Sequence, residues 1–336
     1  MTIKDLAAIT GYAVGTVSRA LNDHPNVSDK ARQTILEAAK EYGFQLNVNA
    51  KQLKQTTSNT ILVIVKGTGN EFFTEMLEYL QPLIARTRYQ LVVDYLDEDH
   101  NEVIRAVQLC REKKPLGILF LGGNAKNFAV DFDKIDIPCV EVTNDASALA
   151  YNNLSSVTTN DREAGRCAID TLVAAGHRKI AIIGGDRKTS DISRLRYEGC
   201  QLSFGEHGIA FDPERDYQGV RFSCQDGYKA TQKLLKNGTE YTAIFAISDV
   251  MAIGAIRALW EAGKRVPEDV SIIGLDGLAL GKYLVPQLST IQQDFRTIAL
   301  RSVEILLDAI EVGNPAKHET VPFQVQRRES IRSLRK

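Results

Sequence analysis

Residues 11–19 read GYAVGTVSR and lie between two segments with helical periodicity. Apolar side chains recur on either side at the three- and four-residue spacing of a helix face, at Ile3, Leu6, Ala7, Val17 and Leu21. Gly11 suits the left-handed backbone that ends many helices, because a residue without a Cβ adopts it at little cost. The stretch therefore predicts a first helix over 3–10, a tight turn, and a second helix over roughly 14–22.

A third helix is predicted within DKARQTILEAAKEYGF, residues 29–44, with Ser28 as its N-cap and Gly43 at its end. Its inward face is expected to carry Ala31, Ile35, Ala38 and Tyr42. Three helices, the first two joined by a tight turn, form a helix-turn-helix unit. One face of the second helix offers donors to phosphates and base edges, at Thr16, Ser18, Arg19 and Asn22. A hairpin that only packs is the alternative, and this polar face favours DNA binding.

The length of 336 residues allows two or three domains with separate cores. The formal net charge is −1, so affinity for nucleic acid has to come from a local patch, and the first 57 residues carry a modest basic excess. No segment resembles an export signal or reaches membrane-spanning length, which predicts a cytoplasmic protein without membrane contact. The five cysteines are widely spaced and form no C-x-x-C pair, which indicates reduced thiols.

The remainder of the chain alternates apolar strands with amphipathic helices after a polar connector, QLNVNAKQLKQTTSN, at 45–59. The connector carries Val48 and Leu53 on a possible short helix that we expect to order only with a partner. Strands are expected at 61–66, 90–96, 117–122, 138–142, 179–185, 217–222, 242–248 and 269–276. This order predicts an α/β fold with two doubly wound parallel-sheet lobes and a ligand site in the cleft between them, at the carboxyl ends of the strands.

Motifs along nearly the whole chain resemble the LacI/GalR family of bacterial repressors. The segment from 2 to 44 is similar to the family's DNA-binding headpiece, and Asn47, Ala50 and Leu53 to its hinge helix. AAGHRKIAIIGG, SRLRYEG, SDVMAIGA, DVSIIGLDG and PQLSTIQQDF resemble landmarks of its effector core. The resemblance implies a headpiece at 1–45, a hinge helix at 46–58, and two lobes of periplasmic-binding-protein type I architecture. Their expected limits are 59–158 plus 292–319 and 159–291 plus 320–336.

For the headpiece, the resemblance implies that the second helix enters the major groove with Val14, Gly15 and Arg19 at base-reading positions. Arg19 can bind guanine O6 and N7 through two hydrogen bonds, so we expect it to provide most of the direct readout. Phosphate contacts are expected from Thr16, Ser18, Asn22 and Asn26. The hinge positions Ala50 and Leu53 are expected at the minor groove, where Leu53 would wedge into a base step. An ordinary contact of Leu53 with the core is the alternative.

In the cleft, the resemblance implies that Arg196 and Asp276 clamp the effector, since a guanidinium donates and a carboxylate accepts from adjacent hydroxyls. Phe72 and Phe222 could cover an apolar ring face, although Phe72 could equally belong to the core. The other candidate effector-binding residues are Asn70 and Ser248, with Asn144 and Asp161 as weaker candidates. Asp249 follows Ser248 and could instead cap the next helix.

Enzyme functions find little support in the sequence. GTGNEF at 67–72 follows a strand, but Phe72 stands where a dinucleotide fingerprint has its third glycine. The five histidines show no metal-ligand spacing, and no G-x-S-x-G nucleophile elbow is present. We therefore expect neither enzyme activity, cofactor nor metal.

The resulting hypothesis is a transcriptional repressor that binds a pseudopalindromic operator as a homodimer and responds allosterically to a small effector, a sugar in the first instance. Two alternatives stay open at this point. One is a catabolite-control-type regulator signalled by a phosphorylated carrier protein, and the other is a sugar-binding protein without a regulatory role. The sequence names neither the effector nor its sign of action.

Overall fold

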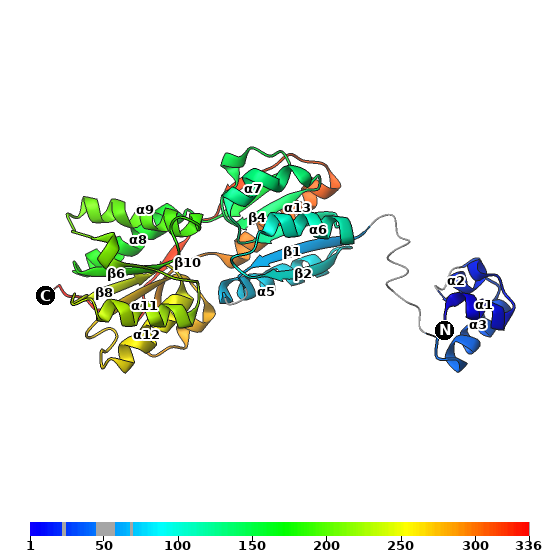
Figure 1. Ribbon diagram of the computed structural model, residues 1–336, viewed down its shortest axis with the longest axis horizontal. Coiled ribbons are helices and arrows are strands. Elements are labelled where there is room, and N and C mark those ends of the chain that lie inside the picture. The colour runs from blue at the N-terminus through cyan, green and yellow to red at the C-terminus, as the bar shows by residue number, and fades with distance from the viewer. Residues whose placement is uncertain (22–24, 45–57, 68–69, 336) are drawn as a thin grey trace. The chain divides into compact units, whose positions relative to one another are not determined.

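The computed structural model describes residues 1–21, 25–44, 58–67 and 70–335 (Figure 1). The chain divides into two compact units, a headpiece within Met1–Ser58 and a core unit formed by Asn59–Lys336. The predicted hinge helix at 46–58 lies almost entirely outside the described residues, as do Asn22, Ala50 and Leu53.

The headpiece consists of α1 (Ile3–Thr10), α2 (Val14–Leu21) and α3 (Asp29–Glu41). Thr2 and Asp5 form a reciprocal capping box at the start of α1, in which the Thr2 amide donates to Asp5 Oδ2 at 2.7 Å. Gly11 ends α1 with a φ of 71°, and Ser28 caps α3 by accepting from the Ala31 amide. These local signals confirm the predicted helices and the tight turn between the first two.

A small apolar cluster holds the three headpiece helices together. Leu6, Val17 and Ile35 are fully buried in it, and small alanines fill the gaps between the helices. One predicted member is wrong: Tyr42 is 52% exposed. Because α3 ends at Glu41, Tyr42 lies beyond the apolar stripe of the helix, and Ala39 is buried instead.

The core unit contains two sheets, each covered by helices on both faces (Figure 1). The first sheet, here the N-lobe sheet, has the order β11-β5-β4-β3-β1-β2, and all its pairs are parallel. Its strands are β1 (Thr60–Lys66), β2 (Gln90–Leu96), β3 (Gly117–Leu121), β4 (Cys139–Thr143), β5 (Leu154–Thr158) and β11 (His318–Thr320). The N-lobe helices are α5 (Glu71–Ala85), α6 (Glu102–Lys113), α7 (Ala125–Asp131), η1 (Phe132–Lys134), η2 (Ser147–Leu149) and α13 (Phe295–Glu311).

The second sheet, here the C-lobe sheet, has the order β12-β10-β9-β8-β6-β7 and is parallel except for the β10–β12 pair. Its strands are β6 (Ile180–Gly184), β7 (Tyr217–Gly219), β8 (Ala243–Ala246), β9 (Ser271–Asp276), β10 (Ser289–Gln292) and β12 (Gln324–Gln326). The C-lobe helices are α8 (Asp161–Ala174), α9 (Asp191–Glu206), α10 (Pro213–Asp216), α11 (Cys224–Leu235), α12 (Asp249–Glu261) and η3 (Ala279–Lys282). The two doubly wound lobes therefore confirm the predicted α/β fold.

The chain passes between the lobes at three places: from β5 to α8, from β10 to α13, and from β11 to β12. As a result α13, late in the sequence, packs on the N-lobe sheet and contributes Phe295 to its core. The sequence pattern did not predict β5, β10, β11 or β12, because these strands are short and carry Ser, Thr, Gln and His among few apolar residues.

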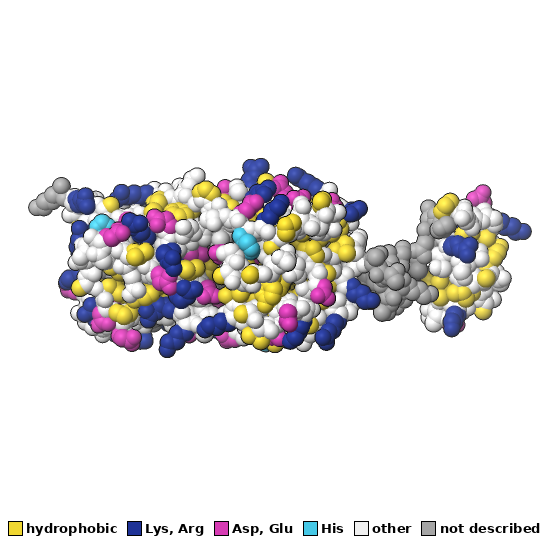
Figure 2. All heavy atoms as spheres, turned by 90° about the horizontal axis from the view of Figure 1, so that it is seen from above, with side chains coloured by type: hydrophobic (Ala, Val, Ile, Leu, Met, Phe, Trp, Pro, Cys, Tyr) yellow, Lys and Arg dark blue, Asp and Glu magenta, His cyan; other side chains and the backbone are white. Residues whose placement is uncertain are grey.

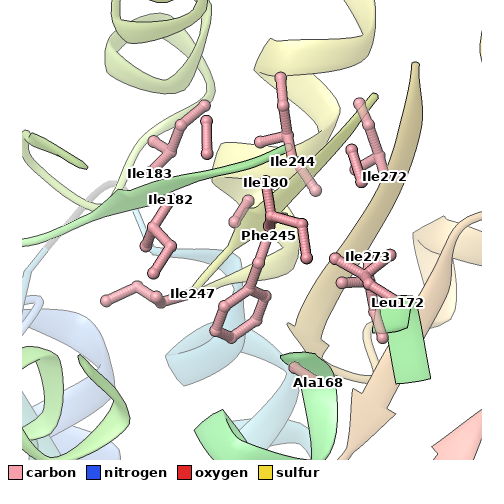
Figure 3. Close-up of a cluster of buried hydrophobic side chains, with 14 of the residues drawn as sticks. Ala168, Leu172, Ile180, Ile182, Ile183, Ile244, Phe245, Ile247, Ile272 and Ile273 are labelled. Atoms are coloured by element: carbon pink, nitrogen blue, oxygen red, sulfur yellow. The ribbon is translucent and has the colours of Figure 1, made fainter. Parts of the chain in front are cut away.

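The C-lobe core is built largely from β-branched side chains on adjacent parallel strands. Figure 3 shows isoleucines of β6, β8 and β9 packed around Phe245 and against Ala168 and Leu172 of α8, and all of these residues are at most 3% exposed. Strands buried on both faces explain the nearly continuous apolar runs in the sequence. This rigid layer fixes the positions of the loops at the carboxyl ends of the strands.

Candidate functional site

The first candidate surface is the exposed face of α2 in the headpiece. Val14, Gly15 and Arg19 are exposed on it, whereas Val17 is buried below. A Cβ added at Gly15 would meet only the Arg19 side chain, at 3.9 Å. No side chain therefore projects from the helix surface at this position. The face therefore presents one guanidinium and one small apolar side chain without intervening bulk.

The predicted phosphate-contacting residues are distributed around this face. Thr16 and Ser18 are half-buried, and Asn26 is exposed before the start of α3. Asn22, Ala50 and Leu53 lie outside the described residues, so their roles stay predictions. The structure thus gathers Val14, Gly15 and Arg19 on one helix face.

The second candidate site is a cleft of about 800 Å³ between the carboxyl ends of the two sheets. This volume falls in the range of small-molecule sites, which are roughly 300–1,000 Å³. Both lobes line the cleft, and Asn70, Phe72, Asn144, Arg196, Phe222 and Asp276 are among the lining residues. Ser248 and Asp161 are buried but do not line it.

Arg196 and Asp276 form the centre of the C-lobe wall. The Arg196 Nε donates to Asp161 Oδ1 at 2.7 Å and its Nη1 donates to the carbonyl oxygen of Ile247 at 2.5 Å. Asp276 Oδ1 accepts from Gln293 Nε2 at 3.0 Å and lies 3.9 Å from Arg196 Nη1. Burial raises the pKa of Asp276 well above its ordinary value, and the nearby guanidinium opposes that rise. Asp161 is thus a positioning residue that holds Arg196 at the cleft wall.

Asp249 positions the loop that carries Asp276, a role the sequence did not reveal. Its Oδ2 accepts from the amides of Gly277 and Leu278, both at 2.8 Å, and its Oδ1 accepts from Thr290 Oγ1 at 2.7 Å. Burial raises the pKa of Asp249 to about 6, and these three donors counteract the rise. The carboxylate is therefore directed at the loop after β9 rather than at the amides of α12.

The aromatic candidates lie on opposite walls of the cleft. Phe72 is only 4% exposed and packs on Phe295, with ring centroids 4.9 Å apart, so it belongs to the N-lobe core as well as to the lining. Phe222 is half-buried against the C-lobe core. Asn70 caps α5 by accepting from the Phe72 amide at 3.1 Å, which fixes the position of this lining residue.

The N-lobe wall contains a buried ionic group that sequence reasoning missed. Lys66 Nζ lies 2.6 Å from Glu102 Oε2, and Glu102 Oε1 accepts from the Asn124 amide at 2.6 Å. Glu141 Oε1 accepts from Asn144 Nδ2 at 2.7 Å, while Glu141 Oε2 and Asn144 Oδ1 are buried without a protein partner. Burial, followed by the nearby charge of Glu102, raises the pKa of Glu141 well above its ordinary value.

Polar contacts join the lobes on both edges of the cleft. On one edge Arg221 of the C-lobe pairs with Asp97, Glu98 and Asp99 of the loop after β2, with 2.8 Å between Arg221 Nε and Glu98 Oε1. On the other edge Asn124 Nδ2 donates to the carbonyl oxygen of Thr189 at 2.8 Å. These contacts link the N-lobe to the C-lobe beside the cleft.

The described part of the chain has neither a metal-binding cluster nor a membrane-spanning helix. It contains no group of three or more His, Cys, Asp and Glu side chains arranged to hold a metal ion. None of its helices is both long enough and apolar enough to cross a bilayer.

Comparison with known proteins gives consistent matches in both parts of the chain. A profile described as "Bacterial regulatory proteins, lacI family" matches residues 2–47, and one described as "Periplasmic binding protein-like domain" matches residues 169–331. The chain is 33% identical over 335 residues to the HTH-type transcriptional regulator MalR of Clostridium butyricum, which covers 98% of this chain and 99% of that one. It is 32% identical over 337 residues to the ribose operon repressor of Haemophilus influenzae, with 99% of each chain covered.

Among solved structures, a lac repressor dimer bound to operator and the anti-inducer ONPF aligns over 98% of both chains, with a TM-score of 0.74 and 25% identity. These proteins are transcriptional regulators rather than enzymes. The chain belongs to the LacI family of bacterial regulatory proteins. It is a DNA-binding transcriptional regulator with a ligand-binding core, which confirms the predicted class.

Proposed function

We propose that this regulator is a cytoplasmic repressor that binds a pseudopalindromic operator as a homodimer. Its affinity for the operator changes when a small polar effector, a sugar, binds. The ribose operon repressor and the operator-bound lac repressor dimer support the proposal by their names and descriptions. The observation that carries it is a cleft of about 800 Å³ whose two walls belong to different lobes. A ligand held by both walls changes how closely the lobes approach.

In the headpiece, α2 enters the major groove with Arg19 as the main base-reading residue and Val14 as an apolar contact. Bidentate pairing with guanine contributes about 1–3 kcal/mol of discrimination against other bases. Thr16, Ser18, Asn22 and Asn26 bind phosphates and fix the register. Exposure of Val14 and Arg19 on one helix face, with Gly15 between them, supports this arrangement.

In the core unit, Arg196 and Asp276 form the polar clamp for the effector, with Asn70, Phe72 and Phe222 completing the walls. Asp161 and Asp249 support the clamp from behind, through the contacts to Arg196 and to the loop after Asp276. Linkage makes the coupling reciprocal: if the effector changes operator affinity by some factor, the operator changes effector affinity by the same factor. The coupling free energy is typically about 1–3 kcal/mol.

The test of the DNA proposal compares Arg19→Ala with Lys40→Ala, which removes one exposed charge from α3 instead. Affinity for a matched operator and for a scrambled duplex is measured at fixed salt, since phosphate contacts make both salt-dependent. Arg19→Ala should lose operator affinity selectively, whereas Lys40→Ala should change both duplexes alike. Equal loss on the two duplexes for Arg19→Ala would show that this residue reads no base.

The test of the effector proposal measures operator binding and melting temperature with a panel of sugars. A bound effector at a hundredfold excess over its Kd stabilises the folded chain by about 2.7 kcal/mol. Asp276→Asn should weaken the response to that sugar while leaving operator affinity without sugar nearly unchanged. A panel that alters neither quantity would contradict a sugar effector.

A further inference from the structure

We infer that the cleft selects effectors without negative charge: it accepts hydrogen-bond donors and excludes phosphorylated or carboxylated ligands. The inference rests on the proposed function of the cleft as the effector site and specifies the chemical class it takes. Three observations carry it, concerning the cations of the cleft, the helix ends that face it, and a buried acceptor that has no protein partner.

Each described cation that lines the cleft is already held by carboxylates. Lys66 is paired with Glu102, and the Glu102 side chain is fully buried. Arg196 is bound to Asp161 and lies beside Asp276, with both ion-pair partners 4% exposed. The charge of both cations is thus already offset by buried carboxylates, so an anionic ligand gains less here than it would beside an unpaired cation.

Arg221 is the third described cation of the lining, and it is more exposed than the other two. It stands among Asp97, Glu98 and Asp99, so the local charge at this edge of the cleft is negative despite the guanidinium. Asp226 lines the cleft close by and adds to that charge. Like charges brought together at an interface repel, which disfavours a phosphate or carboxylate entering here.

Helix N-termini at the carboxyl ends of the strands would otherwise attract an anion. In this chain, however, the helix starts that face the cleft are capped by their own side chains, at Asn70, Asn124, Ser190 and Ser223. Three of these helices also carry a carboxylate in the first turn, at Glu71, Asp191 and Asp226. One amide at each of these helix starts is therefore satisfied by the cap, and the first-turn carboxylates oppose the positive ends of three of the helix dipoles.

One buried acceptor among the described lining residues has no protein partner. Asn144 lines the cleft with its Nδ2 committed to Gly123 and Glu141, and its Oδ1 is buried without a protein partner. A buried acceptor without a donor costs about 1–3 kcal/mol, so a hydroxyl or amine on the ligand gains by supplying one. Phosphate and carboxylate groups cannot donate when ionised, whereas hydroxyl groups of a polyol can.

The first experiment compares matched sugars on the full chain: glucose, galactose and mannose with their 2-amino, 6-carboxylate and 6-phosphate forms. The melting temperature should rise with neutral or amino members and not with their anionic counterparts, which should bind at least about tenfold more weakly. An anionic member that stabilises the chain as much as its neutral parent would overturn the inference. If no sugar changes operator binding, the proposed function fails, and the second experiment still decides the inference.

The second experiment uses inorganic phosphate as the probe and does not depend on knowing the effector. Asp97→Asn combined with Asp99→Asn removes two of the carboxylates around Arg221, and Asp133→Asn with Asp136→Asn removes two exposed carboxylates outside the cleft as the control. At equal ionic strength against chloride, phosphate should raise the melting temperature of the first variant by about 2–4 °C more than that of the wild type or the control.

Phosphate stabilises folded proteins in general, so only the difference between variants counts. Adding Arg221→Ala to the cleft variant should abolish its extra response, because the freed guanidinium is the group that binds the anion. If phosphate raised the melting temperature of the wild type as much as that of the cleft variant, carboxylate pairing would not be what excludes anions.

Discussion

The two lobes of the core unit have corresponding strand orders, apart from the antiparallel β12 of the C-lobe, but are packed with different side chains. In the N-lobe, aromatic rings fill the space between sheet and helices: Phe72 contacts Phe73 and Phe295 on one face, and Phe120, Phe128 and Phe132 form a series on the other. In the C-lobe, isoleucines line the sheet, and the covering helices approach each other at glycines. Large rings thus fill the N-lobe core, whereas the C-lobe helices pack with their backbones in close contact.

The close contact in the C-lobe occurs where α8 and α9 cross. A Cβ at Gly199 would overlap the Arg162 carbonyl oxygen, and a Cβ at Gly165 would overlap that of Arg196. This crossing sets the height of α9 and so the position of the Arg196 guanidinium in the cleft. The C-lobe is therefore the less adaptable of the two lobes, because backbone atoms cannot repack as side chains do.

Truncating a ring in the aromatic core of the N-lobe should cost the most stability. Phe120 is fully buried and packs edge-to-face on Phe128, with centroids 5.0 Å apart. Phe120→Ala should lower the free energy of unfolding by about 3–5 kcal/mol in chemical denaturation, since it removes a large side chain and leaves a cavity. The control Val130→Ala, at a position 73% exposed on α7, should change little, and equal losses would contradict the assigned core.

The next effect tests the glycine contact of the C-lobe. Gly199→Ala should cost roughly 1–3 kcal/mol, because α8 and α9 must separate to admit one methyl group. Gly205→Ala in the same helix meets open space and should be neutral or stabilising, since alanine is the better helix former. Effector affinity should fall with Gly199→Ala only. If neither variant lowered the free energy of unfolding, the contact between α8 and α9 would not be as close as described.

A smaller effect is expected from the cation–π contacts between arginine and tyrosine side chains in the two lobes. Arg187 lies between two C-lobe rings, 4.4 Å from the centroid of Tyr197 and 4.7 Å from that of Tyr217. Arg187→Met should cost about 0.5–2 kcal/mol of stability. In the N-lobe, Arg88 lies over Tyr89 alone with a side chain 74% exposed, so Arg88→Met should be nearly silent. Identical melting temperatures for the two variants would remove this contrast.

The last prediction concerns the buried carboxyl group of the N-lobe, whose effect on stability should be smallest near pH 5, close to the ordinary pKa of a glutamate. Because the pKa of Glu141 is raised in the folded chain, the folded state holds a proton that the unfolded state releases. Its contribution to stability therefore falls as pH rises from the unfolded pKa through the folded pKa, by up to about 1.4 kcal/mol per pH unit.

Glu141→Gln mimics the protonated form, so its stability relative to the wild type should increase with pH over that window. Melting temperatures of both proteins between pH 5 and pH 8 measure the change. The control is Glu112→Gln on the exposed face of α6, which should give parallel curves. A constant difference for Glu141→Gln would mean that this carboxyl group does not titrate differently on folding.

Much of the fold could be predicted because its signals are local. The capping pair at Thr2 and Asp5, the left-handed Gly11 and the apolar runs of the main strands are all readable within a few residues. The short strands β5, β10, β11 and β12 could not be, since pairing with neighbours rather than composition makes them strands. Tyr42 failed for a related reason: periodicity does not specify where a helix ends.

The candidate site also has features that the sequence predicted and features that depend on residues far apart in the chain. Sequence resemblance placed Arg196 and Asp276 together, and they do lie on one wall of the cleft. It did not find the pairing of Lys66 with Glu102, nor that of Arg221 with the three carboxylates after β2, because these partners are 36 and more than 120 residues apart. A charge in a sequence carries no information about which opposite charge it will meet.

A three-helix headpiece, two doubly wound lobes and membership of a family of DNA-binding regulators could be read from the amino-acid sequence, because periodicity, caps and motif order are properties of short stretches of chain. Which cations of the cleft are neutralised, and how closely the C-lobe helices pack, became visible only in the folded chain. Those properties arise where distant segments meet, so they depend on strand order and on contacts between the lobes rather than on any single stretch.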